Sequence, residues 1–201
     1  MGEWTVFLSE QGFNVAGVDI SEQTVARLAW WYPRLEFVRA DLRATAFERE
    51  SFDAYFSWGT FEHCESGIGD CVVEARRILK RGGFLVISVP FDNGRLWVRD
   101  AFELLPWTRR ADRQDEREGC QRFYQWRFTQ AELRRELEQH GFDVHSTTPV
   151  GKMTGAGRWL RSDLGLFSKR SRAYNAACRM AAMMLPARFI GHMVVAVAER
   201  S

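Results

Sequence analysis

Polar residues end or follow three short apolar runs in the first third of the chain, and their types suit ligand binding. They are Asp19, Asp41, and the group Ser57, Gly59, Glu62 and His63. A carboxylate has two oxygens, so one acid can accept hydrogen bonds from both hydroxyls of a ribose, and a second acid can accept from an adenine amino group. Each acid taken alone is explained equally well as a helix N-cap.

His63 is the candidate general base, because the ordinary pKa of imidazole lies near neutrality. Glu62 beside it could orient an acceptor or pair with an arginine. The structural alternative is that His63 caps or orients the loop that follows it. Both side chains also occur as metal ligands, but no spacing assigns further ligands, and we therefore expect no metal site.

The elements that would position these residues alternate between strand and helix patterns. Strands are expected at 14–20, 35–40, 52–58, 84–89, 142–147 and 191–199, and helices at 4–11, 22–31, 71–79 and 130–140. Such alternation predicts an α/β fold, with a doubly wound sheet and helices on both faces. In an open parallel sheet, ligands bind at the carboxyl ends of the strands, which is where the polar residues fall.

Composition limits the classes of protein that need considering. The 201 residues suit a single domain, 1–201, and a net charge of +2 does not indicate a nucleic-acid partner. Four scattered cysteines predict reduced thiols rather than a disulfide framework. No signal peptide or membrane span is recognisable, which favours a cytoplasmic location. The sequence does not indicate an oligomeric state.

Three segments resemble the class I S-adenosylmethionine-dependent methyltransferases, and they occur in the order and at the spacing found in that family. They are GVDIS (17–21), RADLRATAFERESFDAYFSWGTFEH (39–63) and EARRILKRGGFLVISVP (74–90). The later segments 123–144 and 191–199 also look like that family. The resemblance implies a Rossmann-like, mostly parallel sheet with an antiparallel last strand, and S-adenosyl-L-methionine as the cofactor.

The resemblance also implies a role for each site residue. Asp19 would bind the ribose with Ile20 beside the adenine, and Asp41 would accept from the adenine amino group while Leu42 donates through its backbone. Ser57 and Gly59 would hold the methionine part, with Glu62 and His63 facing the reacting methyl group. Asp19 would also suit a nicotinamide-dependent dehydrogenase, but the sequence shows no G-x-G-x-x-G motif and that reading leaves Asp41 unexplained.

The chain departs from the family pattern at its start. Gly2 looks like the last glycine of the family's glycine-rich loop, and the strand and glycines that would precede it are absent. The strands at 14–20 and 52–58 would then have unpaired edges. They are expected to pair with each other, recruit another segment or chain, or form a weakened sheet. A sequence record that starts late and a shortened, non-catalytic relative both account for this.

Two long connections, 91–128 and 151–189, are the expected substrate or lid segments. The first carries Trp97, Trp107 and Trp126, which either line an acceptor pocket or close the core. The second has eight basic side chains and one acid, Asp163. This bias favours an anionic or lipid-linked acceptor or a peripheral membrane contact, and the alternative is a solvated face over a methionine-rich packing surface.

The sequence therefore predicts methyl transfer from S-adenosylmethionine to a small-molecule or lipid- or glycan-linked acceptor. The alternative is a non-catalytic, methyltransferase-like binding module that uses the basic segment 151–189.

Overall fold

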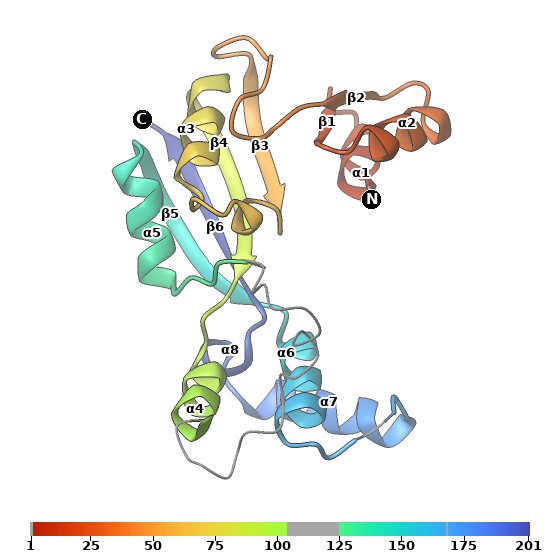
Figure 1. Ribbon diagram of the computed structural model, residues 1–201, viewed down its shortest axis with the longest axis vertical. Coiled ribbons are helices and arrows are strands. Elements are labelled where there is room, and N and C mark those ends of the chain that lie inside the picture. Colours follow the sequence, from red (N-terminus) through yellow and green to blue (C-terminus); the bar gives the residue numbers. More distant parts are fainter. Residues whose placement is uncertain (1, 104–124, 168) are drawn as a thin grey trace, which may run out of the picture.

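The computed structural model describes residues 2–103, 125–167 and 169–201, and Figure 1 shows their arrangement. The first unit contains two parallel strands, β1 (Ala16–Asp19) and β2 (Glu36–Arg39), in which Asp19 pairs with Arg39. Two helices accompany these strands, α1 (Glu3–Glu10) and α2 (Glu22–Trp31). Ser21 begins α2 as expected, because its hydroxyl accepts a hydrogen bond from the backbone of Thr24.

The second sheet has four strands in the order β3-β4-β6-β5. Their bounds are β3 (Phe52–Trp58), β4 (Leu79–Pro90), β5 (Phe142–Val150) and β6 (Met193–Arg200). β3 and β4 are parallel, and β6 runs antiparallel to both of its neighbours. The expected α/β fold with an antiparallel last strand is thus confirmed.

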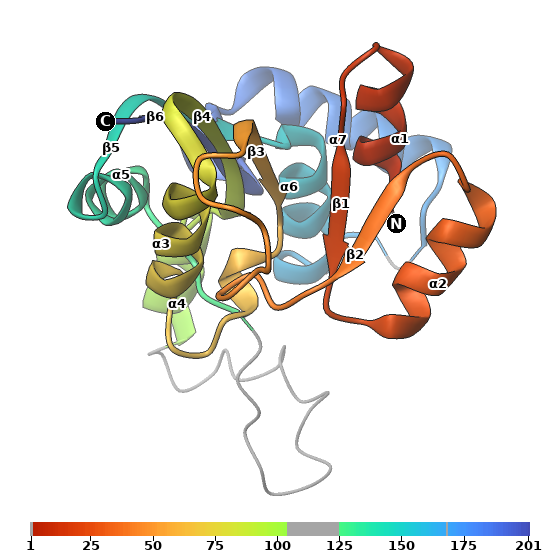
Figure 2. The same ribbon diagram turned by 90° about the horizontal axis from the view of Figure 1, so that it is seen from above.

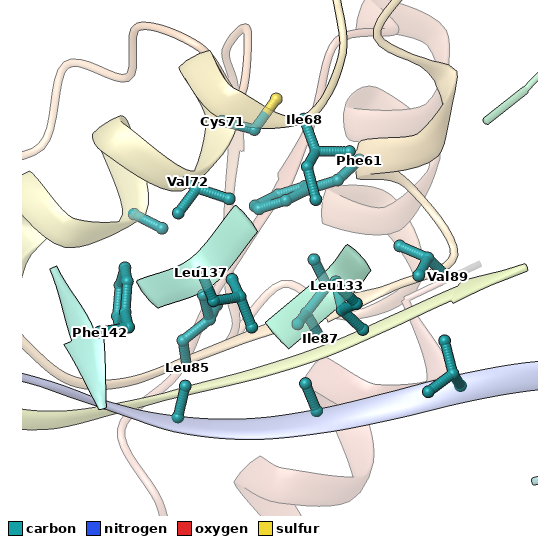
Figure 3. Packing of buried hydrophobic residues seen from close by; sticks show 14 of the residues in the cluster. Phe61, Ile68, Cys71, Val72, Leu85, Ile87, Val89, Leu133, Leu137 and Phe142 are labelled. Carbon is teal, nitrogen blue, oxygen red and sulfur yellow. The ribbon is translucent and has the colours of Figure 1, made fainter. Parts of the chain in front are cut away.

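Two helices cover one face of this sheet and form the main core, drawn in Figure 3. They are α3 (Gly69–Ile78) and α5 (Gln130–Gln139). Alternate residues of β4, Leu85, Ile87 and Val89, point into this core and are fully buried. Helix α5 begins at the expected capping box, in which Thr129 and Glu132 satisfy each other's backbone N–H groups.

Strand β4 is longer than the sequence suggested. It begins at Leu79, directly after α3, whereas the Gly82-Gly83 pair predicted a start at Phe84. Leu79 pairs with Phe52 and the next pair is Ala54 with Phe84, so the residues between them bulge out of the ladder. Gly82 has a φ of 74°, which glycine adopts without strain. The glycines therefore shape a bulge within the strand.

The described parts of the two long connections contribute to a small helical lobe, seen below the sheet in Figure 1. Its elements are α4 (Gly94–Glu103), α6 (Lys152–Arg158), the π-helical turn η2 (Trp159–Asp163), α7 (Arg172–Met184) and α8 (Ala187–Ile190). A second core of Ala156, Leu160, Cys178 and Ile190 holds α6, η2, α7 and α8 together. Trp107 lies outside the described residues.

The β1–β2 unit and the four-stranded sheet share no backbone ladder within the described residues. Of the expected outcomes for β1 and β3, direct pairing of these two strands is therefore not observed. Figure 2 shows β1 and β2 set apart from β3. One contact between the units is the ring of Trp4 in α1, whose centroid lies 5.0 Å from that of Trp58 at the end of β3.

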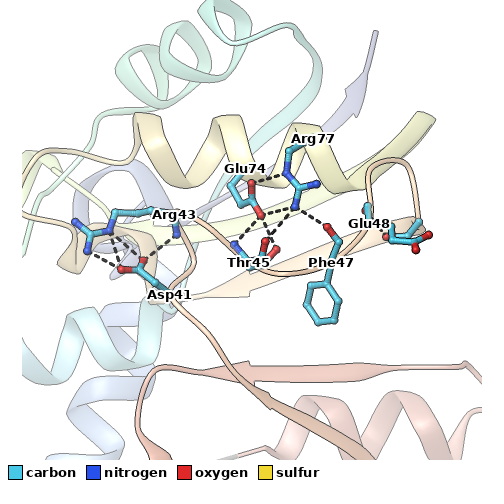
Figure 4. A network of polar contacts seen from close by, with 8 residues as sticks. Asp41, Arg43, Thr45, Phe47, Glu48, Glu74 and Arg77 are labelled. Carbon is cyan, nitrogen blue, oxygen red and sulfur yellow. Dashed lines mark hydrogen bonds and ion pairs between the residues drawn. The ribbon is translucent and has the colours of Figure 1, made fainter.

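A polar network ties the segment after β2 to α3, as drawn in Figure 4. Glu74 of α3 accepts a hydrogen bond of 2.7 Å from the backbone of Thr45 and pairs with Arg77 at 2.7 Å. Arg77 in turn donates to the carbonyl of Phe47 at 2.7 Å. The side chain of Glu74 is 8% exposed, so water cannot readily replace these partners.

We expect Glu74→Ala to lower the free energy of unfolding by about 1–3 kcal/mol, because it leaves the buried N–H of Thr45 without its acceptor. The matched control is Glu138→Ala, which removes an exposed ion pair with Arg134 and should cost less than about 0.5 kcal/mol. Urea unfolding of both variants measures the difference. Equal losses would show that the network does not anchor the segment.

The same network gives a pH dependence. Arg77 and Thr45 lower the pKa of Glu74, so its contribution to stability is complete above the ordinary glutamate pKa and declines as the pH falls below it. In Glu74→Ala this part of the acid sensitivity should be absent.

Candidate functional site

Asp19 is the last residue of β1 and lies at the start of α2. Its Oδ1 accepts a 2.8 Å hydrogen bond from the backbone N–H of Ser21, which fixes the carboxylate. Oδ2 has no hydrogen-bond partner among the described residues and is available to a ligand. The neighbouring Ile20 is 66% exposed, so its side chain is accessible to a ligand held by Asp19.

Asp41 follows β2 but already has a partner. Arg43 donates to its carboxylate through Nη2 at 2.6 Å and through its backbone N–H at 2.9 Å. These bonds lower the pKa of Asp41 to about 2, so the carboxylate is ionised at any physiological pH. An adenine amino group at this place would have to share the carboxylate with Arg43. Leu42 between them packs its side chain against the main core.

A cavity of about 420 Å³ lies beside this ion pair. Its lining is Asp41, Arg43, Ala44, Asp70 and Val73. The cavity therefore lies between the segment after β2 and the first turns of α3.

Buried polar atoms without partners gather at the end of β3. The hydroxyls of Ser57 and of Ser88, on the neighbouring strand β4, are buried and form no hydrogen bond within the described part of the chain. Gly59 follows with a φ of 68°, and its N–H donates to the carbonyl of Ser88 at 3.0 Å. A Cβ at position 59 would lie 3.4 Å from Oε1 of Glu62, an ordinary contact, so the positive φ rather than a lack of space favours glycine here.

Glu62 is the buried ionisable group of this region. It lies in the 3₁₀ turn η1 (Phe61–His63), is 3% exposed, and its Oε2 has no partner among the described residues. Burial raises its pKa above the ordinary glutamate value. His63 beside it is exposed. The structure thus buries Glu62, which the sequence made the secondary candidate, and leaves His63, the preferred candidate base, at the surface.

The connection 91–128 returns to this turn. The backbone N–H of Trp126 donates to the carbonyl of Glu62 at 2.9 Å, and its indole N–H donates to the carbonyl of Cys64 at 3.0 Å. Trp126 is 43% exposed. It therefore holds η1 by its backbone and by the polar edge of its ring, rather than by filling the core.

Gly2 lies at the start of α1 with a φ of 72°, a conformation that favours glycine. A Cβ there would lie 2.7 Å from a methyl group of Leu28 in α2. The glycine at this position therefore lets α1 and α2 approach each other closely, whatever else it contacts.

Sequence reasoning did not single out Asn93 and Arg95, which follow β4. Asn93 caps α4 by accepting from the backbone of Leu96 and donates to the carbonyl of Gly191 at 2.6 Å. Arg95 forms a buried ion pair with Asp163, while its Nε is buried without a partner. The signal that could have found Asn93 is an asparagine directly after a strand and three residues before an apolar helical position.

Three of the four cysteines lie in the described residues. Cys64, Cys71 and Cys178 are free, and the Sγ atoms of Cys64 and Cys71 lie 3.0 Å apart. Burial raises the pKa of the Cys71 thiol. Cys120 lies outside the described residues. No cluster of three His, Cys, Asp or Glu side chains with metal-site geometry occurs in the described ranges.

A larger cavity of about 500 Å³ lies at the other end of the sheet. Its lining is Arg49, Val73, Arg76, Arg77, Gln139, His140, Gly141 and Arg200. These residues come from the ends of α3, α5 and β6, where helix carbonyls point outward and arginines complement them. This cavity is remote from the carboxyl ends of β3 and β4, which carry the candidate site residues.

The raised pKa of Glu62 predicts a pH-dependent effect of Glu62→Gln on stability. Folding disfavours the ionised carboxylate, so the native protein loses stability as the pH rises above the ordinary glutamate pKa, whereas a glutamine does not titrate. Between about pH 4 and about pH 8, the melting temperature of Glu62→Gln should therefore rise relative to that of the wild type. Glu65→Gln, at an exposed position, is the control, and a constant difference for Glu62→Gln would contradict the assignment.

Comparison with known proteins relates the first part of this chain to a protein family. Residues 1–87 match the family described as a methyltransferase domain. No curated protein sequence matches the chain significantly. The family match and the fold confirm the resemblance to class I S-adenosylmethionine-dependent methyltransferases and give no support to the dehydrogenase alternative.

Solved structures share the fold at low sequence identity. One is an S-adenosylmethionine-dependent methyltransferase from Methanosarcina mazei, with a TM-score of 0.63 and 19% identity over 99% of this chain and 87% of that one. Another is the geranyl diphosphate C-methyltransferase from Streptomyces coelicolor A3(2), with a TM-score of 0.61 and 17% identity over 100% and 67%. A third is the 1,6-didemethyltoxoflavin-N1-methyltransferase from Burkholderia thailandensis, with a TM-score of 0.57 and 18% identity over 100% and 67%.

Proposed function

We propose that this chain, whose first 87 residues belong to a methyltransferase-domain family, transfers a methyl group from S-adenosylmethionine to a small-molecule acceptor. The observation that carries the proposal is the set of unsatisfied groups after β1 and β3. Asp19 keeps one carboxylate oxygen without a partner, Ile20 is exposed, and the Ser57 hydroxyl and Glu62 Oε2 are buried without partners. Unsatisfied buried polar atoms are uncommon in native proteins, and a bound ligand is one of the partners that can satisfy them.

The chain's own residues would hold the cofactor by its two ends. Asp19 would accept from the ribose hydroxyls with Ile20 against the adenine, while Asp41, shared with Arg43, and the backbone of Leu42 would complete the adenine contacts. Ser57, Gly59 and Gly2 would lie against the methionine part. S-adenosylmethionine supplies a methyl group on a positively charged sulfur that is already activated for displacement. The main task left to the protein is therefore alignment of the acceptor.

Glu62 and His63 are the groups proposed to act on the acceptor. A carboxylate with a raised pKa is a stronger base than an ordinary one, so Glu62 suits removal of a proton from an oxygen or nitrogen acceptor. His63 is exposed beside it and could pass that proton to solvent. Trp126 fixes the backbone of Glu62 and so holds its position.

The acceptor is proposed to be small, or to be the small head group of a lipid- or glycan-linked molecule. The solved neighbours that act on geranyl diphosphate and on 1,6-didemethyltoxoflavin support a small molecule. The positive charge of the lobe formed by 151–189 supports an acceptor with a negative group. No helix among the described residues has the length and apolar character needed to cross a bilayer.

A non-catalytic binding module is the second candidate, and one observation favours it. Asp19 ends β1 and Asp41 follows β2, whereas Ser57 lies in β3 and Gly59 and Glu62 follow it. The two sheets share no backbone ladder in the described ranges. A cofactor would have to bridge the two units. Cofactor binding therefore separates the two candidates.

We expect S-adenosylhomocysteine at a hundred times its dissociation constant to raise the melting temperature of the chain by about 5–10 °C. Asp19→Asn should weaken binding by roughly 10- to 100-fold in calorimetry, because it removes a charge-assisted hydrogen bond to the ribose. Glu22→Gln, in the first turn of α2, is the control and should bind normally. Unchanged affinity of Asp19→Asn would overturn the ribose assignment, and no shift with the wild type would favour the binding module.

Turnover distinguishes Glu62 from His63. With a true acceptor, Glu62→Gln should lower kcat by about 100-fold or more while leaving S-adenosylhomocysteine affinity unchanged. His63→Ala should lower the rate without unfolding the chain, and by less than Glu62→Gln if it acts only as a relay. Wild-type turnover of Glu62→Gln would exclude it as the base, and wild-type turnover of His63→Ala would exclude any role of His63 in proton transfer.

A further inference from the structure

Helix α7 has one face in the lobe core and one face in solvent. Tyr174, Cys178 and Ala181 belong to the lobe core or pack against it. The opposite face carries three methionines that extend away from the described part of the protein: Met180 is 62% exposed, Met183 84% and Met184 78%. The sequence left open that the methionines form a surface that packs on the rest of the lobe. These three methionines do not form such a surface.

Arginines flank the exposed methionines. Arg172, Arg179 and Met183 fall on one stripe of α7, because spacings of seven and four residues are close to whole helical turns. Both arginines are exposed and have no ion-pair partner among the described residues. Helix α7 has no acidic residue.

The lobe around α7 adds to this positive charge. Lys169, Arg170 and Arg188 lie in the segments that flank the helix, and all are exposed. The single acid of 151–189, Asp163, is mostly buried in its ion pair with Arg95 and so contributes little negative charge to the surface. The exposed charge of this part of the lobe is thus of one sign.

We propose that the exposed face of α7 docks on a membrane surface that contains anionic lipids. Exposed unbranched apolar side chains with arginines along one side of them are the pattern of a helix that lies in the bilayer interface. The arginines would pair with lipid phosphates, and the methionines would insert between the acyl chains. An acidic protein could attract the same charge, but a protein partner would more commonly present a groove for such a helix, whereas a bilayer accepts a single convex helix.

The place of α7 in the fold gives this surface a use, and this step rests on the proposed function. The lobe joins the sheet at the end of β4 and the start of β6. The side-chain methyl group of Met193, the first residue of β6, would lie 3.7 Å from a Cβ on Gly59. The lobe therefore borders the candidate acceptor site, and docking through α7 would hold that site near the bilayer. A lipid-linked or membrane-dissolved acceptor would then be within reach.

The test is co-sedimentation of the 201-residue chain with vesicles rich in phosphatidylglycerol and with vesicles of phosphatidylcholine alone. We expect binding to the anionic vesicles only, and weaker binding at higher salt. Arg172→Ala with Arg179→Ala should weaken it roughly 25-fold. Met180→Gln with Met183→Gln should weaken it about tenfold or more, because insertion of apolar side chains is lost.

The matched control is the pair Arg49→Ala and Arg81→Ala. It removes the same charge from exposed positions at the opposite end of the sheet and should leave vesicle binding nearly unchanged. Absence of binding by the wild type, or equal losses in the control pair, would overturn the proposal. Wild-type binding by the methionine variant would also overturn it, since attraction would then be purely electrostatic. Capture on immobilised polyglutamate without vesicle binding would point to an acidic protein instead.

S-adenosylhomocysteine binding, measured on the same preparations, keeps this proposal separate from the proposed function. Normal cofactor binding in both α7 variants shows that they are folded. Vesicle binding without cofactor binding would support the surface and contradict the methyltransferase activity. Cofactor binding without vesicle binding would contradict the membrane-docking surface and leave the proposed function standing.

Discussion

Burial of one face of the four-stranded sheet is the interaction on which the rest of the structure depends. The inward side chains of β6 are small, Val194, Ala196 and Ala198, so the larger Leu133 and Leu137 of α5 can pack directly over them. Because β6 lies between β4 and β5, this packing fixes three strands at once. This packing therefore sets the positions at which the three strands end.

Short connections at the ends of these strands position the residues of the candidate site. The turn at Gly59 leaves β3 with a positive φ and places Glu62 beside it, and Trp126 holds the turn from the other side. Each of these is a local constraint, and together they bury a carboxylate that has an unsatisfied oxygen. Such an arrangement costs stability, and this cost is the reason for proposing a functional role for Glu62.

The β1–β2 unit is attached differently. It contacts the sheet through side chains such as Trp4 and Trp58, and the segment after β2 is anchored to α3 by Glu74 and Arg77. Backbone pairing between the units is not part of this attachment in the described residues. The residues proposed for the adenosine and methionine ends of the cofactor are therefore positioned by two separate sheets, and their relative placement depends on a few side-chain contacts.

The sequence by itself determined the order and nature of most elements. Apolar periodicity, the caps at Ser21 and Thr129 and the stop at Gly141 act over a few residues, so they can be seen without the fold. The early start of β4 at Leu79 could not be seen, because a glycine pair predicts a turn and only pairing with Phe52 makes it a bulge. Within the site, the sequence selected Asp19, Asp41, Glu62 and His63 as chemical types.

Only the tertiary structure decided their environments. It buried Glu62 and left His63 exposed, because burial depends on residues far apart in the chain, such as Trp126, which hydrogen-bonds to η1. The pairing of Asp41 with Arg43, two residues away, is by contrast a local contact. The tertiary structure also placed Met180, Met183 and Met184 in solvent. A helical pattern alone does not decide whether such residues are buried or exposed, because the same spacing occurs on core faces and on surface faces. Local interactions thus determined the elements, and long-range packing decided the charge, exposure and partners of the residues they carry.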